Sequence, residues 1–200
     1  MKQASSRELF DHWAARRGKR AAPERGEIEP SAIRRALGDV FILEFNRRAG
    51  HPFRFVGTRV CALFGRELKN EPFLNLWDEE TRAQFAQLLF VVADEVSGAV
   101  AGVKGRTGEG WAQDLELVLL PLTQHGDTHA RMIGALTPFN APFCLGVSRL
   151  ALTLGNVRYL DPAQEMPAPA RLVAGIQGPA RRTLFRVHEG GRAQSRPIKP

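Results

Sequence analysis

Residues 53–68 read FRFVGTRVCALFGREL, and this stretch decides the fold. Its first residues alternate like a strand with one covered face, so we expect Phe53 and Phe55 to point to the same side of a sheet. Thr58 follows a glycine and is placed to cap a short helix with its hydroxyl. The apolar stripe of that helix consists of Val60, Leu63 and Phe64. A strand that runs directly into a small helix predicts a hollow between the two elements.

Further strands lie on both sides of this unit. The expected strands are residues 40–45, 53–56, 99–106, 111–122 and 129–138. A long helix over residues 79–96, capped by Asp78, separates the second strand from the third. Two strands, then helices, then three strands joined by turns of hairpin length predict an α+β domain. We expect a five-stranded antiparallel sheet with helices on one face, to which residues 150–160 add either a strand or a helix.

The N-terminal region predicts helices outside this domain. Residues 5–17 have an amphipathic pattern, with Ser5 and Glu8 at the spacing of a capping box. A second short helix is expected to start at Pro30, after a basic connector. The chain thus divides into residues 1–38 (flanking helices and connector), 39–160 (the α+β domain) and 161–200 (a basic tail). The tail is rich in turn residues, and we expect it to be mostly disordered.

The chain has 200 residues, a formal net charge of +7 and 44% hydrophobic residues, enough for one domain with its own core. The positive charge lies in the flanks, because residues 51–160 carry ten Lys/Arg against eleven Asp/Glu. Proteins that read duplex DNA concentrate basic residues on the folded face that docks, and this chain does not fit that pattern. No apolar stretch is long enough to span a membrane and no signal-peptide pattern opens the chain, so we expect a cytoplasmic protein.

Several residues give the chain a family likeness. They are Trp13, the connector residues Pro23, Arg25 and Pro30, the joint Arg54, Phe55, Val56, Gly57 and Thr58, and the following Gly65. On these residues the chain resembles single-PAS-domain proteins of alphaproteobacteria, over residues 8–160. It departs from their pattern at Asn70, where a glycine is usual; Asn tolerates left-handed backbone, so we expect the turn to persist. The resemblance implies a sensory or protein-interaction module, often dimeric through an N-terminal helix.

A PAS-like hollow would be lined by apolar side chains from the strands and the helices. The candidate ligand pocket is Phe53, Phe55, Leu63, Phe85, Leu88, Leu89, Val92, Leu115 and Leu117. Such walls suit a small apolar ligand, although the same helical stripe also fits a plain core. The candidate contact surface for a homodimer or a protein signalling partner is the N-terminal stripe of Leu9, Phe10 and Trp13.

Catalytic, metal and cofactor chemistry finds little support in the residue pattern. The helix over residues 79–96 carries no His that could ligate haem, and the five histidines read as surface residues. Cys61 and Cys144 match no metal or redox spacing, and Cys61 is not in a flavin-photosensor sequence. Asp114 and Glu116 alternate with leucines and are expected on the wet face of their strand. We therefore predict no catalytic residue, no metal and no cofactor.

The sequence thus predicts a non-enzymatic sensory or regulatory module that acts in signal transduction through a small ligand, a protein partner or both. The alternative is a nucleic-acid- or nucleotide-binding regulator that uses the basic flanks, among them residues 16–20 and 181–186. A small α+β enzyme of the isomerase kind ranks last, because no carboxylate is placed for burial in the hollow. Arg54 is expected to pair with Glu44 across the hairpin rather than to hold an acidic ligand.

Overall fold

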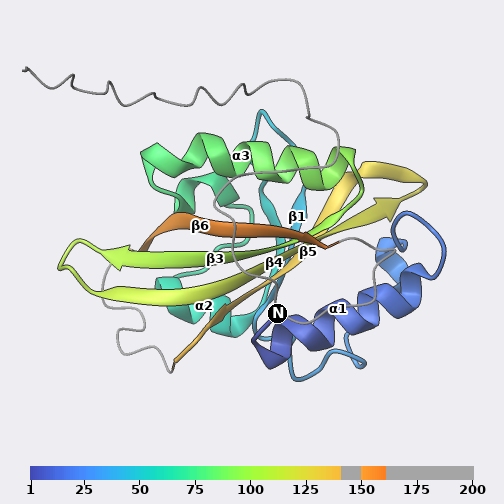
Figure 1. Ribbon diagram of the computed structural model, residues 1–200, viewed down its shortest axis with the longest axis horizontal. Helices are drawn as coiled ribbons and strands as arrows, with labels where there is room; N and C mark the ends of the chain where they lie inside the picture. The colour runs from blue at the N-terminus through green and yellow to red at the C-terminus, as the bar shows by residue number, and fades with distance from the viewer. Residues whose placement is uncertain (141–149, 161–200) are drawn as a thin grey trace, which may run out of the picture.

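The computed structural model describes residues 1–140 and 150–160, which build one antiparallel sheet (Figure 1). The six strands of this sheet lie in the order β2-β1-β5-β4-β3-β6. They are β1 (Val40–Glu44), β2 (Phe53–Val56), β3 (Gly98–Thr107), β4 (Ala112–Gln124), β5 (Asp127–Pro138) and β6 (Leu150–Leu160). All five strands expected from the sequence form, and the stretch left open as strand or helix becomes β6, which pairs with β3. The tail over residues 161–200, including its expected disorder, lies outside the described residues, as does Cys144.

Three α-helices and two short 3-10 helices complete the described part of the chain. They are α1 (Ala4–Arg17), η1 (Arg25–Glu27), α2 (Thr58–Phe64), η2 (Phe73–Leu76) and α3 (Glu79–Asp94). The cap of α3 is confirmed, because the Asp78 carboxylate accepts a hydrogen bond from the Thr81 amide at 2.8 Å. The capping box expected for α1 is wrong: the helix begins at Ala4, and Ser5 lies inside it. None of the described helices has the length and apolar character that crossing a membrane requires.

The helix expected from Pro30 does not form. Residues 30–39 make a run of turns whose backbone hydrogen bonds span three residues, as from Ile33 N to Pro30 O and from Asp39 N to Ala36 O. A continuous α-helix needs bonds that span four residues. Ile33 and Ala36 are buried in the core beneath α1, so tertiary packing holds the run in this tighter shape.

Helices cover both faces of the sheet: α2 and α3 of the α+β domain lie on one face, as expected, and the N-terminal flanking helix α1 lies on the other. α3 packs on β4, β5 and β6, whereas α1 packs on β4 and β5 from the opposite side (Figure 1). We call the face under α3 the inner face and the face under α1 the outer face. The burial along β4 explains this arrangement. Successive side chains of a strand point to opposite faces, and Leu115 through Leu122 are all buried, so both faces of the strand need a cover.

A β-bulge separates Phe53 from Phe55. In the pairing of β1 with β2, Leu43 lies opposite Phe53 and Ile42 opposite Phe55, so Arg54 is the extra residue of β2. Phe53 therefore faces the inner core, while Phe55 packs against the outer core. The expectation that the two rings share a face is wrong, because the simple alternation does not hold across a bulge.

Gly38 supplies the cap of α2 that was expected from Thr58. The backbone carbonyl of Gly38 accepts hydrogen bonds from the amides of Arg59 at 2.9 Å and Val60 at 3.2 Å. The Thr58 side chain makes no cap, and the N-cap residue is Gly57. The expected left-handed turn at Asn70 is confirmed, with φ of 66°.

Candidate functional site

Eight of the nine side chains expected to line a pocket meet in one cluster on the inner face. They are Phe53, Leu63, Phe85, Leu88, Leu89, Val92, Leu115 and Leu117, and all are buried. Phe55 is not among them, because the bulge at Arg54 turns its ring to the outer face. The inner cluster thus brings together side chains of α2, α3, β2 and β4 on the inner face of the sheet.

Aromatic rings fill the middle of this cluster. The ring centre of Phe73 lies 5.1 Å from those of Phe41 and Phe53 and 5.2 Å from that of Phe85. Trp77 stacks on Phe85 with ring centres 3.7 Å apart. Because aromatic side chains bury large areas and pack in defined geometries, these five rings set the shape of the interior. Phe73 and Trp77 come from η2 and the residue after it.

Two polar ring atoms are buried without a hydrogen-bond partner among the described residues: Trp77 Nε1 and His51 Nδ1. His51 is 2% exposed, and its ring centre lies 4.8 Å from that of Phe45. Burial lowers the pKa of His51 to about 4, and the nearby charge of Arg47 adds to the effect. The expectation of surface histidines is therefore wrong for His51, whose imidazole is neutral at pH 7.

On the outer face, α1 uses its apolar stripe inside the chain. Leu9 and Trp13 are 0% and 2% exposed, and Trp13 Nε1 donates a hydrogen bond to the Pro121 carbonyl at 2.8 Å. Phe10 is half-buried, with its ring centre 6.1 Å from that of Trp13. Leu9 and Trp13 can therefore touch a partner only when α1 leaves the sheet.

The N-terminal end of α1 rests on a buried acid. Glu116 is 5% exposed, and its carboxylate accepts hydrogen bonds from the amides of Lys2 at 2.6 Å and Gln3 at 2.9 Å. A carboxylate here satisfies amides at the start of the helix and complements the positive end of its dipole. The placement of Glu116 on a wet face is wrong, because β4 is covered on both sides. The hydroxyls of Ser6 and of Thr137, the β5 neighbour of Glu116, are also buried and lack a partner among the described residues.

Asp39 joins α1 to α2 through the start of β1. Its carboxylate is buried, and Oδ2 accepts a hydrogen bond from Ser5 Oγ of α1 at 2.5 Å. From α2, Arg59 donates Nε to Oδ1 at 2.7 Å and Nη2 to Oδ2 at 2.8 Å. Such a two-pronged arginine contact fixes the orientation of both side chains. One carboxylate therefore links the outer helix α1 with the inner helix α2.

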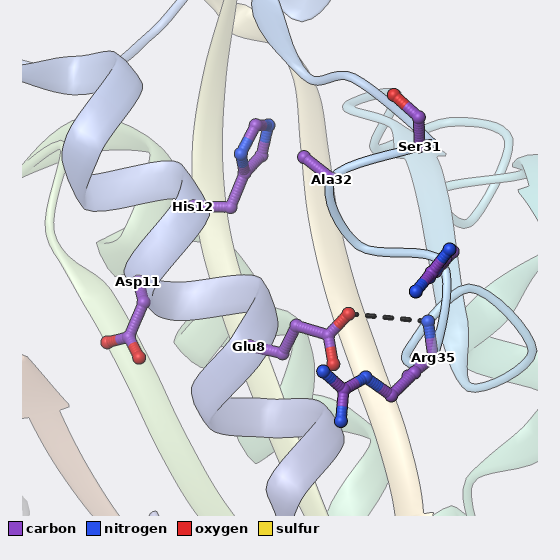
Figure 2. Close-up of a pocket in the computed structure, with 7 residues that line it drawn as sticks. Glu8, Asp11, His12, Ser31, Ala32 and Arg35 are labelled. Atoms are coloured by element: carbon purple, nitrogen blue, oxygen red, sulfur yellow. Dashed lines mark hydrogen bonds between the residues drawn. The ribbon is translucent and has the colours of Figure 1, made fainter.

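A groove of about 530 Å³ runs between α1 and the turn run over residues 31–35 (Figure 2). Glu8 Oε1 accepts a hydrogen bond from the Arg35 amide at 3.3 Å, and His12 Nε2 accepts one from the Glu29 amide at 3.1 Å. These bonds tie the turn run to α1. Two polar side chains of α1 in this groove are thus satisfied by backbone amides of the segment opposite.

Cys61 on α2 has the environment of a structural thiol. Burial raises the pKa of the Cys61 thiol, and the Glu67 carboxylate 3.9 Å from Sγ also raises it. A thiol with a raised pKa is a weak nucleophile at neutral pH. The described residues also contain no group of three or more His, Cys, Asp and Glu side chains that could hold a metal ion.

A family model described as a PAS domain matches residues 1–137, which include α1, α2, α3 and the sheet through most of β5. The chain belongs to the PAS-domain family. No curated protein sequence matches this PAS domain.

Solved structures similar to this PAS domain include two LOV proteins and a further PAS domain. The LOV protein of Rhodobacter sphaeroides has 12% identity and a TM-score of 0.43, over 55% of this chain and 66% of that chain. The LOV domain of a blue-light activated histidine kinase from Erythrobacter litoralis has 12% identity and a TM-score of 0.41, over 51% of this chain and 95% of that chain. The PAS domain of an HTR-like protein from Haloarcula marismortui has 19% identity and a TM-score of 0.37, over 55% of this chain and 91% of that chain.

Two positions that organise this PAS domain, Asp39 and Phe73, were not predicted from the sequence, and a third, Glu116, was placed on the wrong face. Phe73 lies in an irregular segment rich in large apolar residues, and that richness was a usable signal for burial. Asp39 bonds to Ser5 of α1 across 34 residues, and Glu116 bonds to Lys2, just before α1, across 114 residues. Nothing local identifies such partners, because the pairing depends on how α1 crosses the sheet.

Proposed function

We propose that this PAS domain is a non-enzymatic sensory or regulatory module whose output element is α1. In this role a signal changes how α1 docks on the outer face, and the stripe of Leu9, Phe10 and Trp13 then meets a second copy or a protein partner. The Asp39 junction is the observation that carries the proposal, because it ties α1 to α2 on the other side of the sheet.

The inner core has a physical route to this junction. α2 buries Val60, Leu63 and Phe64 in the aromatic cluster and carries Arg59 on its exposed side. Interiors are close-packed, so a change in the aromatic packing moves α2 as a unit. Any movement of α2 displaces the Arg59 guanidinium, and the Asp39 carboxylate must then follow it or lose its partner.

α1 is held by two kinds of contact, which suits a helix that docks reversibly. Its middle is apolar, with Leu9 and Trp13 in the outer core. Its first turns rest on Glu116, Asp39 and buried hydroxyls instead. A hydrogen bond to a charged group contributes a net of about 1.5–3 kcal/mol, because it exchanges for a bond with water. The first turns can therefore be released by exchanging these bonds for bonds with water.

Hydrogen exchange of α1 amides tests the coupling through Asp39. The variant Arg59→Gln removes the guanidinium from α2 without touching α1. We expect the amides in the first turns of α1, around Ser5, to exchange about fivefold faster, which corresponds to ~1 kcal/mol of local stability. The matched control is Arg66→Gln, because Arg66 lies just beyond the end of α2 and forms an ion pair, with Glu71, that does not reach α1.

The two variants separate coupling from general loosening. Faster exchange of α1 in Arg59→Gln, with the wild-type rate in Arg66→Gln, supports the role of α1. An unchanged α1 in Arg59→Gln, or the same increase in both variants, would remove Asp39 as a link and α1 as the output element.

A small apolar ligand in the inner core is the second candidate input. Trp77 Nε1 is buried there without a partner among the described residues, so a ligand that carries one acceptor atom would satisfy it. Such a ligand has to displace part of the ring cluster around Phe73. Native mass spectrometry of the purified chain checks this input: a retained small molecule that is lost in Trp77→Phe supports it, and a bare chain in both proteins contradicts it.

A further inference from the structure

A second groove lies on the outer face, at the β1–β2 end of the sheet, with a volume of about 330 Å³. It is lined by Arg25, Ile42, Arg54, Phe55, Gln124 and Arg131. Three of these six residues are arginines, and the remaining lining is apolar, aromatic or amide. A pocket of this volume is at the lower end of the range for small-molecule sites.

Ile42 and Phe55 form the floor. They are direct partners in the pairing of β1 with β2, so their side chains stand next to each other on the outer face. The bulge at Arg54 is what brings the Phe55 ring to this side of the sheet. Phe55 is only half-buried, which leaves part of an aromatic ring available at the base of the groove.

Two of the arginines are oriented by a shared acid. Arg54 Nε donates to Glu44 Oε2 at 2.7 Å, and Arg131 Nη1 lies 3.3 Å from the same oxygen. The expected pairing of Arg54 with Glu44 is thereby confirmed. The hydrogen bond from Arg54 lowers the pKa of the Glu44 carboxyl, with smaller contributions from Asn46 and the charge of Arg131, so Glu44 stays anionic and continues to hold both side chains.

The third arginine, Arg25, begins η1, and the residue before it is hydrogen-bonded to the sheet. Glu24, next to Arg25, accepts hydrogen bonds from the amides of Gly126 at 3.0 Å and His125 at 3.3 Å in the β4–β5 turn. Glu27 closes the short helix by accepting from the Glu24 amide at 2.7 Å. Arg25 itself is exposed and has no ion-pair partner within residues 1–140 and 150–160. Its guanidinium is therefore positioned by its backbone yet free to bind.

We propose that this outer groove binds a mononucleotide. The Arg25 guanidinium holds its phosphate, because a planar N–H fork matches phosphate oxygens in charge and geometry. Arg54 and Arg131, which also bond to Glu44, Asn70 and the Ala130 carbonyl, add their remaining N–H donors and their positive charge. The base stacks on the exposed part of the Phe55 ring, and the Gln124 amide reaches the edge of the base with its donor and acceptor. The groove attracts an anion because its three arginines outnumber the single acid, Glu44, that pairs with two of them, Arg54 and Arg131.

This site does not depend on α1 acting as the output element. The groove can bind its ligand whether or not the Asp39 junction transmits a signal, because no residue of that junction lines it. Failure of nucleotide binding therefore leaves the role of α1 standing, and failure of the coupling test leaves this groove untouched.

Isothermal titration calorimetry of the full chain at about 50 mM salt tests the proposal, since phosphate contacts weaken with salt. The probes are adenosine and guanosine monophosphates, with adenosine alone and inorganic phosphate alone as the two halves of the ligand. We expect saturable one-to-one binding of at least one monophosphate and weaker binding of either half.

Three variants assign that binding to the groove. Arg25→Gln and Arg131→Gln are each expected to weaken monophosphate binding about tenfold, the usual effect of losing one charge-assisted contact. Phe55→Leu is expected to weaken monophosphate binding by a similar factor and to leave phosphate binding unchanged, because it removes only the stacking surface. The matched control is Arg66→Gln, an arginine with one ion pair outside the groove, which we expect to bind like wild type.

Four outcomes overturn the proposal. The first is the absence of saturable monophosphate binding at millimolar concentration, and the second is equal weakening by the control and the groove variants. The third is adenosine binding as tightly as its monophosphate, which removes the phosphate role. The fourth is tight binding of a short oligoadenylate with none of the monophosphates, which makes the groove a site for RNA.

Discussion

Gly57 lies so close to Gly38 that a Cβ added to Gly57 would come within 2.3 Å of the Gly38 carbonyl oxygen. That oxygen is the acceptor that caps α2, so the strand-to-helix joint depends on a near contact between two backbones. Backbone atoms cannot give way as a flexible side chain can. The joint therefore has room for glycine alone.

The variant Gly57→Ala should lose more than about 2 kcal/mol of unfolding free energy, because the added methyl must push the β1 entry away from α2. Urea denaturation measures the loss. The control is Gly102→Ala, where an added Cβ meets nothing within 4 Å, and its unfolding free energy should change by less than about 1 kcal/mol. Equal losses in the two variants would contradict a steric role for Gly57.

Replacing Glu116 by Gln should loosen the start of α1. The variant keeps an acceptor but removes the charge that bonds the Lys2 and Gln3 amides, and we expect a loss of about 1–2 kcal/mol. Amide exchange over the first two turns of α1 should accelerate by the factor that corresponds to this loss of free energy. Asp114→Asn is the control on the same strand: the Asp114 side chain is 67% exposed, and its pair with Lys104 is 3.8 Å long. We expect Asp114→Asn to lower the unfolding free energy by less than about 0.5 kcal/mol. A comparable loss in both variants would contradict the role of Glu116 at the start of α1.

His51 should make stability depend on pH in the acid range. Its pKa in the folded chain is about 4, below the ordinary value of 6.5, so between these values the unfolded chain binds more protons. Unfolding free energy should therefore rise with pH through this window and reach its full value above pH 6.5, by as much as about 3 kcal/mol from this group.

His51→Asn removes this titration and keeps a residue that tolerates the left-handed backbone at this position, where φ is 58°. Denaturation curves at several pH values in both proteins give the difference slope. A slope between pH 4 and 6.5 that is as steep in the variant as in wild type assigns the pH dependence to other groups.

Asp78 holds the start of α3 to β6. Its carboxylate accepts hydrogen bonds from the Thr81 amide and from Thr153 Oγ1 of β6, both at 2.8 Å. Burial alone would raise the pKa of Asp78, but the bonds from Thr81 and Thr153 lower it below its usual range. This contribution to stability is therefore present above the ordinary pKa of 3.8 and is lost as the pH falls through the folded-state pKa.

The variant Asp78→Ala should lose about 1–2 kcal/mol of unfolding free energy, and its amides should exchange faster in β6 as well as in α3. Thr153→Val isolates the strand-side bond, and we expect it to speed exchange in β6 alone. Glu80→Ala, an exposed change in the same first turn, serves as the control. If β6 exchanges at the wild-type rate in all three proteins, the tie between α3 and the sixth strand is not significant.

Local patterns predicted what depends on neighbours in the sequence. The strand over residues 53–56, the helix with the Phe85 stripe and the cap at Asp78 all need only short-range information, and the structure confirms each of these elements. The pairing of Arg54 with Glu44 belongs with them, because a hairpin brings the two residues close.

The features that the sequence did not predict depend on distant contacts. Thr58 has the chemistry of a cap, but the Gly38 carbonyl reaches the α2 amides first. Phe55 changes face because β2 takes in one residue more than β1 opposite it. Glu116 looks solvated by alternation, and only the path of α1 across the sheet buries it. Each of these depends on where a remote backbone lies, which periodicity does not contain.

Within residues 1–140 and 150–160, one chain covers both faces of the sheet and buries most of its apolar strand residues. If α1 lifts away, Val118, Leu120 and Ile133 lose their cover, and water is a poor replacement for it. A partner that binds these outer-face residues must compete with α1 for the same apolar surface. Signalling by this chain would then be an exchange of one cover for another, with the affinity of a partner always reduced by the affinity of the chain for itself.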